Sequence, residues 1–594
     1  MGRPVSLTGP HGTGKSETVK GLAKAMGIMC LQISCTEDTS LTGLDKLLVG
    51  VIQSGVWALF DQFRTMDTSI LSLLSTKLID FRNKLLQQEE RFMFGPFDIK
   101  LHPKTGIFVT QNILPYALPR PEIPETLSRL FRPVSCFVPD LDMVAETMLY
   151  AEGFLEAKLL SKALISLYSG CSQYLSKQTH YDFYTVHTMK TVAAGAGQLL
   201  RDQKHSTHLT PEMNVTEHEV FLRAVRSITL AQLVSEDVPV FSGLLRELLS
   251  GMVKDIKDFP KETFDRVASS MRLISVLSFT GASHPRFTST LNEVLVEDKL
   301  DTVPAVRDKQ RDKIYQLYES TKVGHCTMVV GPTSGGKSTI IATLVKTGIA
   351  MGVQTQVYPL NPKSLPIKEL YGVLDPITQF WTEGVLSYIF RQMNIPGSYE
   401  TTDSQRPSGD TIPGTEPLCQ DNRSSLFSTL SETRQLRNYI VLDGDLDEVW
   451  LENMNSVLDE SKTLCLPNGG RTELVHHCRI LFEIPHLHHC SPSTISRCGI
   501  VYVDPSTLGI EPYWSRWLSL NVKPENGEER LEFKNRLNGL FVKYVSSCLS
   551  LFTHRRIPLQ TVIPMTPLNM IVQLCTILKY NLDGYYGLFS FVPI

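Results

Sequence analysis

A phosphate-binding loop that occurs twice is the feature of this sequence that most constrains its fold. The segments Gly9–Ser16 (GPHGTGKS) and Gly331–Ser338 (GPTSGGKS) both match the pattern GxxxxGK[ST]. Each follows a short apolar stretch and precedes a helix-forming one, the strand–loop–helix setting in which this pattern binds nucleotide phosphates. Chance could give one match to so short a pattern, but it does not account for two copies in the same setting. We therefore expect two nucleotide-binding modules in tandem.

Further landmarks recur in the same order after each loop. Apolar stretches that end in aspartate, Trp57–Asp61 and Tyr439–Asp443, are typical of the Walker B strand of nucleotide-binding sheets. Later apolar stretches, Gly106–Asn112 and Arg479–Glu483, each end in a polar residue. Continuous apolar strands separated by helices predict a parallel sheet with helices on both faces.

The fold class expected from this repeat is α/β, with tandem AAA+ P-loop NTPase modules. Each module should be a parallel sheet flanked by helices and followed by a helical lid. We expect the first large subdomain at 1–140, its lid at 141–215, the second large subdomain with N-terminal helices at 216–505, and the second lid at 506–594. The polar stretch 206–219 should join the modules, and the Ser-, Thr-, Pro- and Gly-rich stretch 397–422 should form an exposed loop.

The residues of the two loops predict ATP and Mg²⁺ as ligands. Glycines let backbone N–H groups point at phosphates, the lysine reaches the β- and γ-phosphates, and the hydroxyl binds Mg²⁺. The expected ATP-binding residues are Gly9, Gly12, Gly14, Lys15, Ser16 and Asp61 in the first module, and Gly331, Gly336, Lys337, Ser338 and Asp443 in the second. Among these, Ser16 with Asp61 and Ser338 with Asp443 should hold Mg²⁺.

Hydrolysis requires further groups. A glutamate usually follows the Walker B aspartate in AAA+ proteins and polarises the attacking water, but here the residues are Gln62 and Gly444. General-base assistance, typically worth about 10²–10⁴ in rate, is therefore expected to be weak or absent. Asn112 is placed to position the water in the first module. Arg497 is placed to reach the first site from the second module and to stabilise charge on the γ-phosphate, although an ordinary salt-bridging arginine is the alternative.

Composition argues against two kinds of partner. The formal net charge is −3, so no global basic field favours nucleic acid. No apolar run approaches the roughly 18 residues of a membrane helix, so no membrane partner is expected. The 12 cysteines include no CxxC pair, which fits reduced thiols in the cytoplasm better than a disulfide framework.

Longer motifs make nearly the whole chain resemble dynein heavy chains, and axonemal ones in particular. The first module is similar at Gln53–Asp61 (QSGVWALFD), Leu130–Val134 (LFRPV), Ala145–Phe154 (AETMLYAEGF) and His180–Phe183 (HYDF). The second is similar at Leu360–Lys363 (LNPK), Glu369–Gly372 (ELYG), Val449–Asp459 (VWLENMNSVLD) and Ser491–Gly499 (SPSTISRCG).

The resemblance implies a ring of six AAA+ modules that moves on microtubules, with the first site hydrolytic and the second binding ATP without turnover. Arg497 matches the arginine finger of that family. The implied partners are the remaining heavy-chain modules, intermediate and light chains, and microtubules, in the cytoskeleton of the ciliary axoneme. The sequence begins almost on the first phosphate-loop strand and ends within the second lid, so we expect a segment of a longer heavy chain.

Two departures from the family pattern affect the first site. Gln62 replaces the catalytic glutamate, and Val186 stands where an arginine that senses the γ-phosphate is usual. A dynein-type AAA+ ATPase with weak or absent hydrolysis is therefore the leading hypothesis. A non-hydrolysing ATP-binding scaffold is the first alternative, favoured by Gln62, Val186 and Gly444. A midasin-like remodelling protein is the second, although the run Asn453–Asp459 (NMNSVLD) resembles dynein instead.

Overall fold

The structure is a computed structural model whose described residues cover both modules. They are 3–10, 12–35, 41–95, 97–112, 123–183, 185–206, 217–255, 285–300, 303–375, 378, 380–394, 436–447, 450–451, 453–459, 461–466, 468, 470–487, 490–504, 509–521, 527–545, 547–549 and 566–586. The loop expected at 397–422 and most of the connection expected at 206–219 lie outside them.

The first sheet carries the first phosphate loop on its central part. Its strands are all parallel, in the order β2 (Cys30–Ser34), β3 (Trp57–Asp61), β6 (Gly106–Asn112), β1 (Val5–Gly9) and β7 (Arg132–Ser135). It packs with α1 (Lys15–Ala25), α2 (Leu41–Ser54), α3 (Thr68–Gln87) and α4 (Glu125–Leu130), and a hairpin of β4 (Arg91–Phe94) and β5 (Phe97–Lys100) adjoins α3. Ala58, Leu59 and Phe60 of β3 are at most 1% exposed, so this strand is buried on both faces as its continuous apolar run predicts.

The second sheet repeats the topology of the first. Its parallel strands run in the order β16 (Gly499–Tyr502), β8 (Cys326–Val330), β15 (Cys478–Ile484), β12 (Leu436–Asp443) and β9 (Gln354–Leu360). Read from β9, this order matches the first sheet strand for strand. The main helices of this module are α11 (Pro285–Glu297), α12 (Pro304–Val323), α13 (Lys337–Ala350) and α15 (Val385–Asn394). The expected tandem α/β architecture is therefore confirmed.

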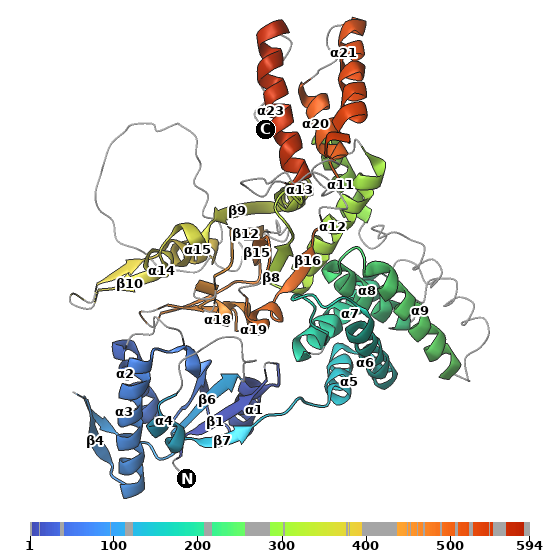
Figure 1. The fold of residues 1–594 in the computed structure, drawn as a ribbon. Helices are drawn as coiled ribbons and strands as arrows, with labels where there is room; N and C mark the ends of the chain where they lie inside the picture. Colours follow the sequence, from blue (N-terminus) through green and yellow to red (C-terminus); the bar gives the residue numbers. More distant parts are fainter. Residues whose placement is uncertain are drawn as a thin grey trace, which may run out of the picture.

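Shorter elements decorate the second sheet. They are η2 (Pro362–Ser364), α14 (Ile367–Tyr371), α18 (Asn455–Leu458), α19 (Pro492–Ile495), and two hairpins, β10 (Gly372–Leu374) with β11 (Trp381–Glu383) and β13 (Thr463–Cys465) with β14 (Arg471–Glu473). In Figure 1 the α18–α19 corner faces the first sheet, drawn in blue. The second module thus presents these short helices to the first.

Five helices follow the first sheet and share one hydrophobic core: α5 (Leu141–Glu152), α6 (Ala157–Tyr174), α7 (Val186–Ser206), α8 (Glu217–Gln232) and α9 (Val238–Asp255). Phe221 of α8 and Phe241 of α9 are buried in the same cluster as Leu164 of α6. The border expected between residues 215 and 216 therefore falls between helices that pack together. The domain limits as a whole stay a prediction.

This helical subdomain also packs against the second sheet (Figure 1), because α8 contacts both β16 and α12. The His180 ring stacks on the Tyr502 ring with centroids 5.0 Å apart and 6° between the planes. The Ser235 hydroxyl donates to Asp504 Oδ2 at 2.6 Å. The first lid is thus bound to the second module by both packing and polar contacts.

The last helices form a separate cluster, drawn in red in Figure 1. They are α20 (Glu511–Asn521), α21 (Gly527–Leu540), a π-helical turn η4 (Phe541–Val545) and α23 (Pro567–Tyr586). Their core contains Trp514, Trp517 and Phe541, with Ile571 and Cys575 from α23. Across the part of the chain that the structure describes, every helix falls short of the length and hydrophobicity that a membrane span needs.

Candidate nucleotide sites

The first phosphate loop has the backbone conformation that an anion requires. Gly12 and Gly14 have φ angles of 73° and 76°, in the left-handed region that glycine adopts without strain. Gly14 caps α1, which begins at Lys15, so the N-terminal N–H groups of the helix point into the loop. A Cβ on Gly9 would collide with the Cys136 carbonyl oxygen, so that position also needs glycine. The sequence folds here into a cradle for phosphate.

Lys15 lies in this cradle and is 7% exposed. Its amine donates to the carbonyl oxygens of Gly9 at 3.1 Å and Pro10 at 2.5 Å. Burial lowers the pKa of the amine, the Asp61 carboxylate opposes this, and the charge of Arg497 lowers it further. A phosphate in the loop would relieve that burial cost by pairing with the buried amine.

The Walker B carboxylate of Asp61 is held by three side chains. The Ser16 hydroxyl donates to Oδ1 at 3.2 Å, the Thr110 hydroxyl donates to the same oxygen, and Gln32 Nε2 donates to Oδ2 at 3.1 Å. A carboxylate beside a hydroxyl at the phosphate loop is the donor set that a hard cation such as Mg²⁺ prefers. Thr110 and Gln32 were not expected from the sequence, because only the sheet register brings them to Asp61.

Gln62, which follows Asp61, connects the first module to the second. Its backbone is left-handed (φ 56°, ψ 44°), and its N–H donates to Thr110 Oγ1 at 3.3 Å. Its side-chain Oε1 accepts a hydrogen bond from Asn455 Nδ2 at 3.2 Å. The residue expected to face the attacking water is thus also bonded across the interface between modules.

Two further residues named for the first site, Asn112 and Val186, belong to elements that adjoin its loop. Asn112 ends β6 and pairs in register with Gly9, so it stands beside the start of the loop. Val186 is the first residue of α7. A Cβ on Gly12 would meet the Thr185 methyl group at 3.3 Å, so the beginning of α7 lies against the loop.

Arg497 approaches the first site from the second module. It follows α19, its side chain is 13% exposed, and its Nε lies 2.5 Å from Asp459 Oδ1. Its Nη1 is buried and has no hydrogen-bond partner among the described residues. The Arg497 charge also lowers the pKa of His187 in α7, after the larger effect of burial. A partly buried cation with an unpaired donor nitrogen, beside the first phosphate loop, fits an anionic ligand.

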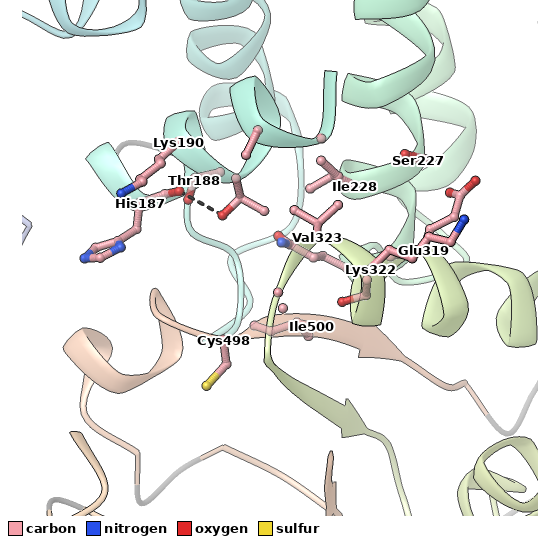
Figure 2. A pocket seen from close by; sticks show the side chains of 18 of the residues that line it. His187, Thr188, Lys190, Ser227, Ile228, Glu319, Lys322, Val323, Cys498 and Ile500 are labelled. Carbon is pink, nitrogen blue, oxygen red and sulfur yellow. Dashed lines mark hydrogen bonds between the residues drawn. The ribbon is translucent and has the colours of Figure 1, made fainter. Parts of the chain in front are cut away.

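A cavity of about 220 Å³ lies on the lid side of Arg497, between α7, α8, α12 and the start of β16 (Figure 2). Figure 2 shows Thr188 of α7, Ile228 of α8 and Val323 of α12 around it. No residue of either phosphate loop lines this cavity within the described parts of the chain. The cavity is therefore separate from the two phosphate sites, although Arg497 and His187 border it.

The second phosphate loop repeats the geometry of the first. Gly336 caps α13 with a φ of 86°, and the buried Lys337 amine donates to the carbonyl oxygens of Gly331 at 2.7 Å and Pro332 at 3.0 Å. Burial lowers the pKa of this amine as it does that of Lys15. The Ser334 hydroxyl donates to Asn569 Oδ1 of α23 at 2.6 Å, so the second lid contacts its own loop.

The carboxylates of the second site differ from those of the first. The Ser338 hydroxyl donates to Glu483 Oε1 at 2.6 Å, a residue outside the Ser338 and Asp443 pair that the sequence predicts to hold Mg²⁺. Glu483 pairs in register with Asp443. In the first site, Thr110 bonds to Asp61 and follows Val109, which pairs with Phe60. Burial raises the pKa of Glu483, and the Asp443 charge raises it further. The sequence shows that the stretch Arg479–Glu483 ends in an acidic residue. The contact of Glu483 with Ser338 and its position beside Asp443 depend on the pairing of β15 with its neighbouring strands.

Gly444 follows Asp443 with a φ of 143°. A Cβ at this position would lie 2.8 Å from Asn361 Oδ1, and the φ angle is one that residues with side chains rarely adopt. The second site therefore has no group in the position of the catalytic glutamate.

Comparisons with the sequences of known proteins cover nearly the whole chain. The profile of the family described as the hydrolytic ATP binding site of dynein motor region matches residues 1–338. Dynein axonemal heavy chain 10 of Homo sapiens is 38% identical over 582 residues, 97% of this chain and 11% of that protein. The Dynein-1-alpha heavy chain, flagellar inner arm I1 complex, of Chlamydomonas reinhardtii is 38% identical over 586 residues, with the same coverage.

The Dynein beta chain, flagellar outer arm, of Chlamydomonas reinhardtii is 33% identical over 571 residues, 96% of this chain and 11% of that protein. The chain thus spans about 11% of the length of the relatives it matches. The resemblance found in the motifs is confirmed, and nucleotide binding follows from the family. Because the family profile covers more than half of the sequence, the chain belongs to the dynein motor-region family.

Proposed function

We propose that this chain is the ATP-binding segment of an axonemal dynein motor. In a full-length heavy chain it would couple ATP binding and hydrolysis in the AAA+ ring to minus-end-directed movement on microtubules of cilia or flagella. Its partners would be the other heavy-chain modules, intermediate and light chains, and microtubules. The names of the axonemal and flagellar relatives support this location in the cytoskeleton of the axoneme.

The observation that carries the proposal is the partly buried Arg497 of the second module beside the phosphate loop of the first. Lys15 would bind the β- and γ-phosphates of ATP, and Ser16 with Asp61 would hold Mg²⁺. The bound Mg²⁺ would neutralise phosphate charge. Arg497 would stabilise the charge that develops on the γ-phosphate, as an arginine supplied by a neighbouring module does. Asn112 and Gln62 would orient the attacking water.

Turnover at the first site would be slow. An amide is a poor proton acceptor, and Gln62 Oε1 already accepts a hydrogen bond from Asn455. Val186 supplies no charge where a γ-phosphate-sensing arginine is usual. Loss of general-base help alone should cost about 10²–10⁴ in rate, or roughly 3–5 kcal/mol of barrier.

The second site would bind Mg-ATP without hydrolysing it, through Gly331, Gly336, Lys337 and Ser338. Gly444 supports this role because no side chain can polarise water there. A non-hydrolysing scaffold that uses ATP as a structural ligand at both sites is the second candidate function. The observation that favours it is the Gln62–Asn455 contact, which engages the only acceptor that the Gln62 side chain has.

The binding proposal is tested by calorimetric titration of Mg-ATP into Lys15→Ala, Lys337→Ala and the double variant. Each lysine makes a charge-assisted contact, so each single change should weaken one site by about 1.5–3 kcal/mol, or roughly 10- to 150-fold. Lys20→Ala in α1 and Lys346→Ala in α13 are matched controls, since both lysines pair with carboxylates outside the loops. Two bound nucleotides in the double variant, at the affinity of the unmodified chain, would refute the proposal.

A further inference from the structure

The contact between Gln62 and the second module is part of a buried hydrogen-bonded chain. Asn455, the first residue of α18, is 3% exposed, and Thr494 of α19 is 1% exposed. Thr494 Oγ1 donates to Asn455 Oδ1 at 3.1 Å, and Asn455 Nδ2 donates to Gln62 Oε1 at 3.2 Å. One end of this chain therefore lies in the second module and the other beside the first Walker B aspartate.

The orientation of the Asn455 amide follows from the donor behind it. The Thr494 N–H donates to Ser491 Oγ at 3.3 Å, and the two hydroxyl oxygens lie 2.8 Å apart. Because the Thr494 hydroxyl gives its one proton to Asn455 Oδ1, Ser491 is the donor between the two hydroxyl groups. Asn455 consequently turns its amide nitrogen toward Gln62, and the Gln62 side chain accepts this hydrogen bond through its oxygen.

The same corner of the second module is anchored from two other sides. His325 Nε2 lies 2.7 Å from the Val457 carbonyl oxygen and so ties α18 to the residue before β8. Asp459 follows α18, and its carboxylate pairs with Arg497, which follows α19. The two short helices thus present Asn455 and Arg497 to the first module from one fixed corner.

We propose that Asn455 is a positioning residue for Gln62: it holds the Oε1 atom, the one acceptor of that side chain, toward the second module. This Asn455–Gln62 contact, here called the clasp, needs no nucleotide, but its consequence for hydrolysis rests on the proposed function. The acceptor that could orient the attacking water is engaged by the second module, which adds to the low basicity of the amide.

A carboxylate introduced by Gln62→Glu fits the same clasp. One oxygen would accept the Asn455 N–H, and the second would remain an acceptor for the attacking water. Asn455 should therefore hold the introduced carboxylate in one orientation, and removal of Asn455 should release it even where the fold is unchanged.

The clasp is tested first by hydrogen exchange of the nucleotide-free chain. Exchange of the backbone of residues 61–66 should rise at least about threefold in both Gln62→Ala and Asn455→Ala, since local opening becomes easier. The double variant should exceed neither single variant appreciably. Asn438→Ala is the control, because Asn438 is equally buried in the second module but bonds to the Met393 carbonyl oxygen within that module.

Single-turnover hydrolysis supplies the second readout. In the Gln62→Glu background, Asn455→Ala should lower the single-turnover rate by at least about threefold and leave ATP affinity unchanged, and Asn438→Ala should change neither. Unchanged exchange at 61–66 together with an unchanged rate would overturn the clasp while two bound nucleotides still upheld the proposed function. Raised exchange in a chain that binds no nucleotide would uphold the clasp and refute the proposed function.

Discussion

The two nucleotide sites share one backbone and differ in their charges. Both loops end in a left-handed glycine that caps a helix, and both lysines are folded onto two loop carbonyl oxygens. Beside the Walker B aspartate, however, the first site has the neutral Thr110 and the second has Glu483. Phosphate binding thus depends on backbone geometry that the repeat preserves, whereas metal binding and turnover depend on single side chains that it does not.

The sites also differ in what covers them. Asn455 and Arg497 reach the first site from another module, while Asn569 of its own lid contacts the second loop. Movement between the two modules would therefore act on the first site directly.

The largest effect is expected from Arg497. In a chain made active by Gln62→Glu and extended to the full motor, Arg497→Ala should lower kcat at the first site by about 10³–10⁵ and leave ATP binding at Lys337 unchanged. Arg471→Ala is the matched control, because Arg471 also crosses the interface but bonds to the Gln32 carbonyl oxygen. Equal losses of kcat in both variants would show that interface packing, not the Arg497 charge, is responsible.

The next effect concerns the missing base. Gln62→Glu, alone and with Val186→Arg, should raise turnover by about 10²–10⁴ when single-turnover kinetics are measured in the full motor. The reason is that a carboxylate accepts the proton of the attacking water and the arginine senses the γ-phosphate. An increase below about tenfold in the double variant would show that these residues do not limit the rate, as would an unmodified motor already above about one turnover per second.

A smaller effect is expected from Glu483→Thr, which gives the second site the threonine that the first site has at Thr110. In a Lys15→Ala background, Glu483→Thr should reduce the Mg²⁺ dependence of ATP affinity by about tenfold, since one carboxylate near the metal and the phosphates is lost. The raised pKa of Glu483 means that this group takes up a proton at a higher pH than an ordinary glutamate. The Mg²⁺ dependence should therefore fall as the pH drops through that pKa in the unmodified chain, and should stay flat in the variant.

Calorimetry at several pH values, with and without Mg²⁺, measures this third effect. The matched change in the first site is Thr110→Glu in a Lys337→Ala background, which should increase its Mg²⁺ dependence. A Glu483→Thr variant that retains the full Mg²⁺ dependence would assign the metal to Asp443 alone.

Local chemistry was predictable from the sequence and long-range pairing was not. Each loop lies between an apolar strand and a helix, so its conformation depends on neighbours in the chain, and the motif indicates it directly. The Gln62–Asn455 contact joins residues 393 apart in the sequence, and no local pattern encodes that partnership. The hydrogen bond from Ser338 to Glu483 likewise depends on the end of β15 lying beside the second phosphate loop, which the sequence does not specify.

The packing of α8 shows that the boundary between subdomains also depends on long-range contacts. An apolar helix face indicates that the helix will be buried, but it does not say against which core. The expected border at 215 was set between the first lid and the start of the second module. Phe221 and Phe241 lie after this border but pack with helices α5, α6 and α7, which lie before it.

The stacking of His180 on Tyr502 and the bond from Ser235 to Asp504 have a mechanical consequence. They join the lid of the first module to the sheet of the second module. The part expected to move as one body is therefore this lid with the second sheet, and not a complete module of sheet and lid. Tilting of this lid over the first loop would carry the second sheet, and with it Arg497, through the same rotation. Opening of the first site and withdrawal of Arg497 would then be one motion, and the second phosphate loop would move together with the second sheet.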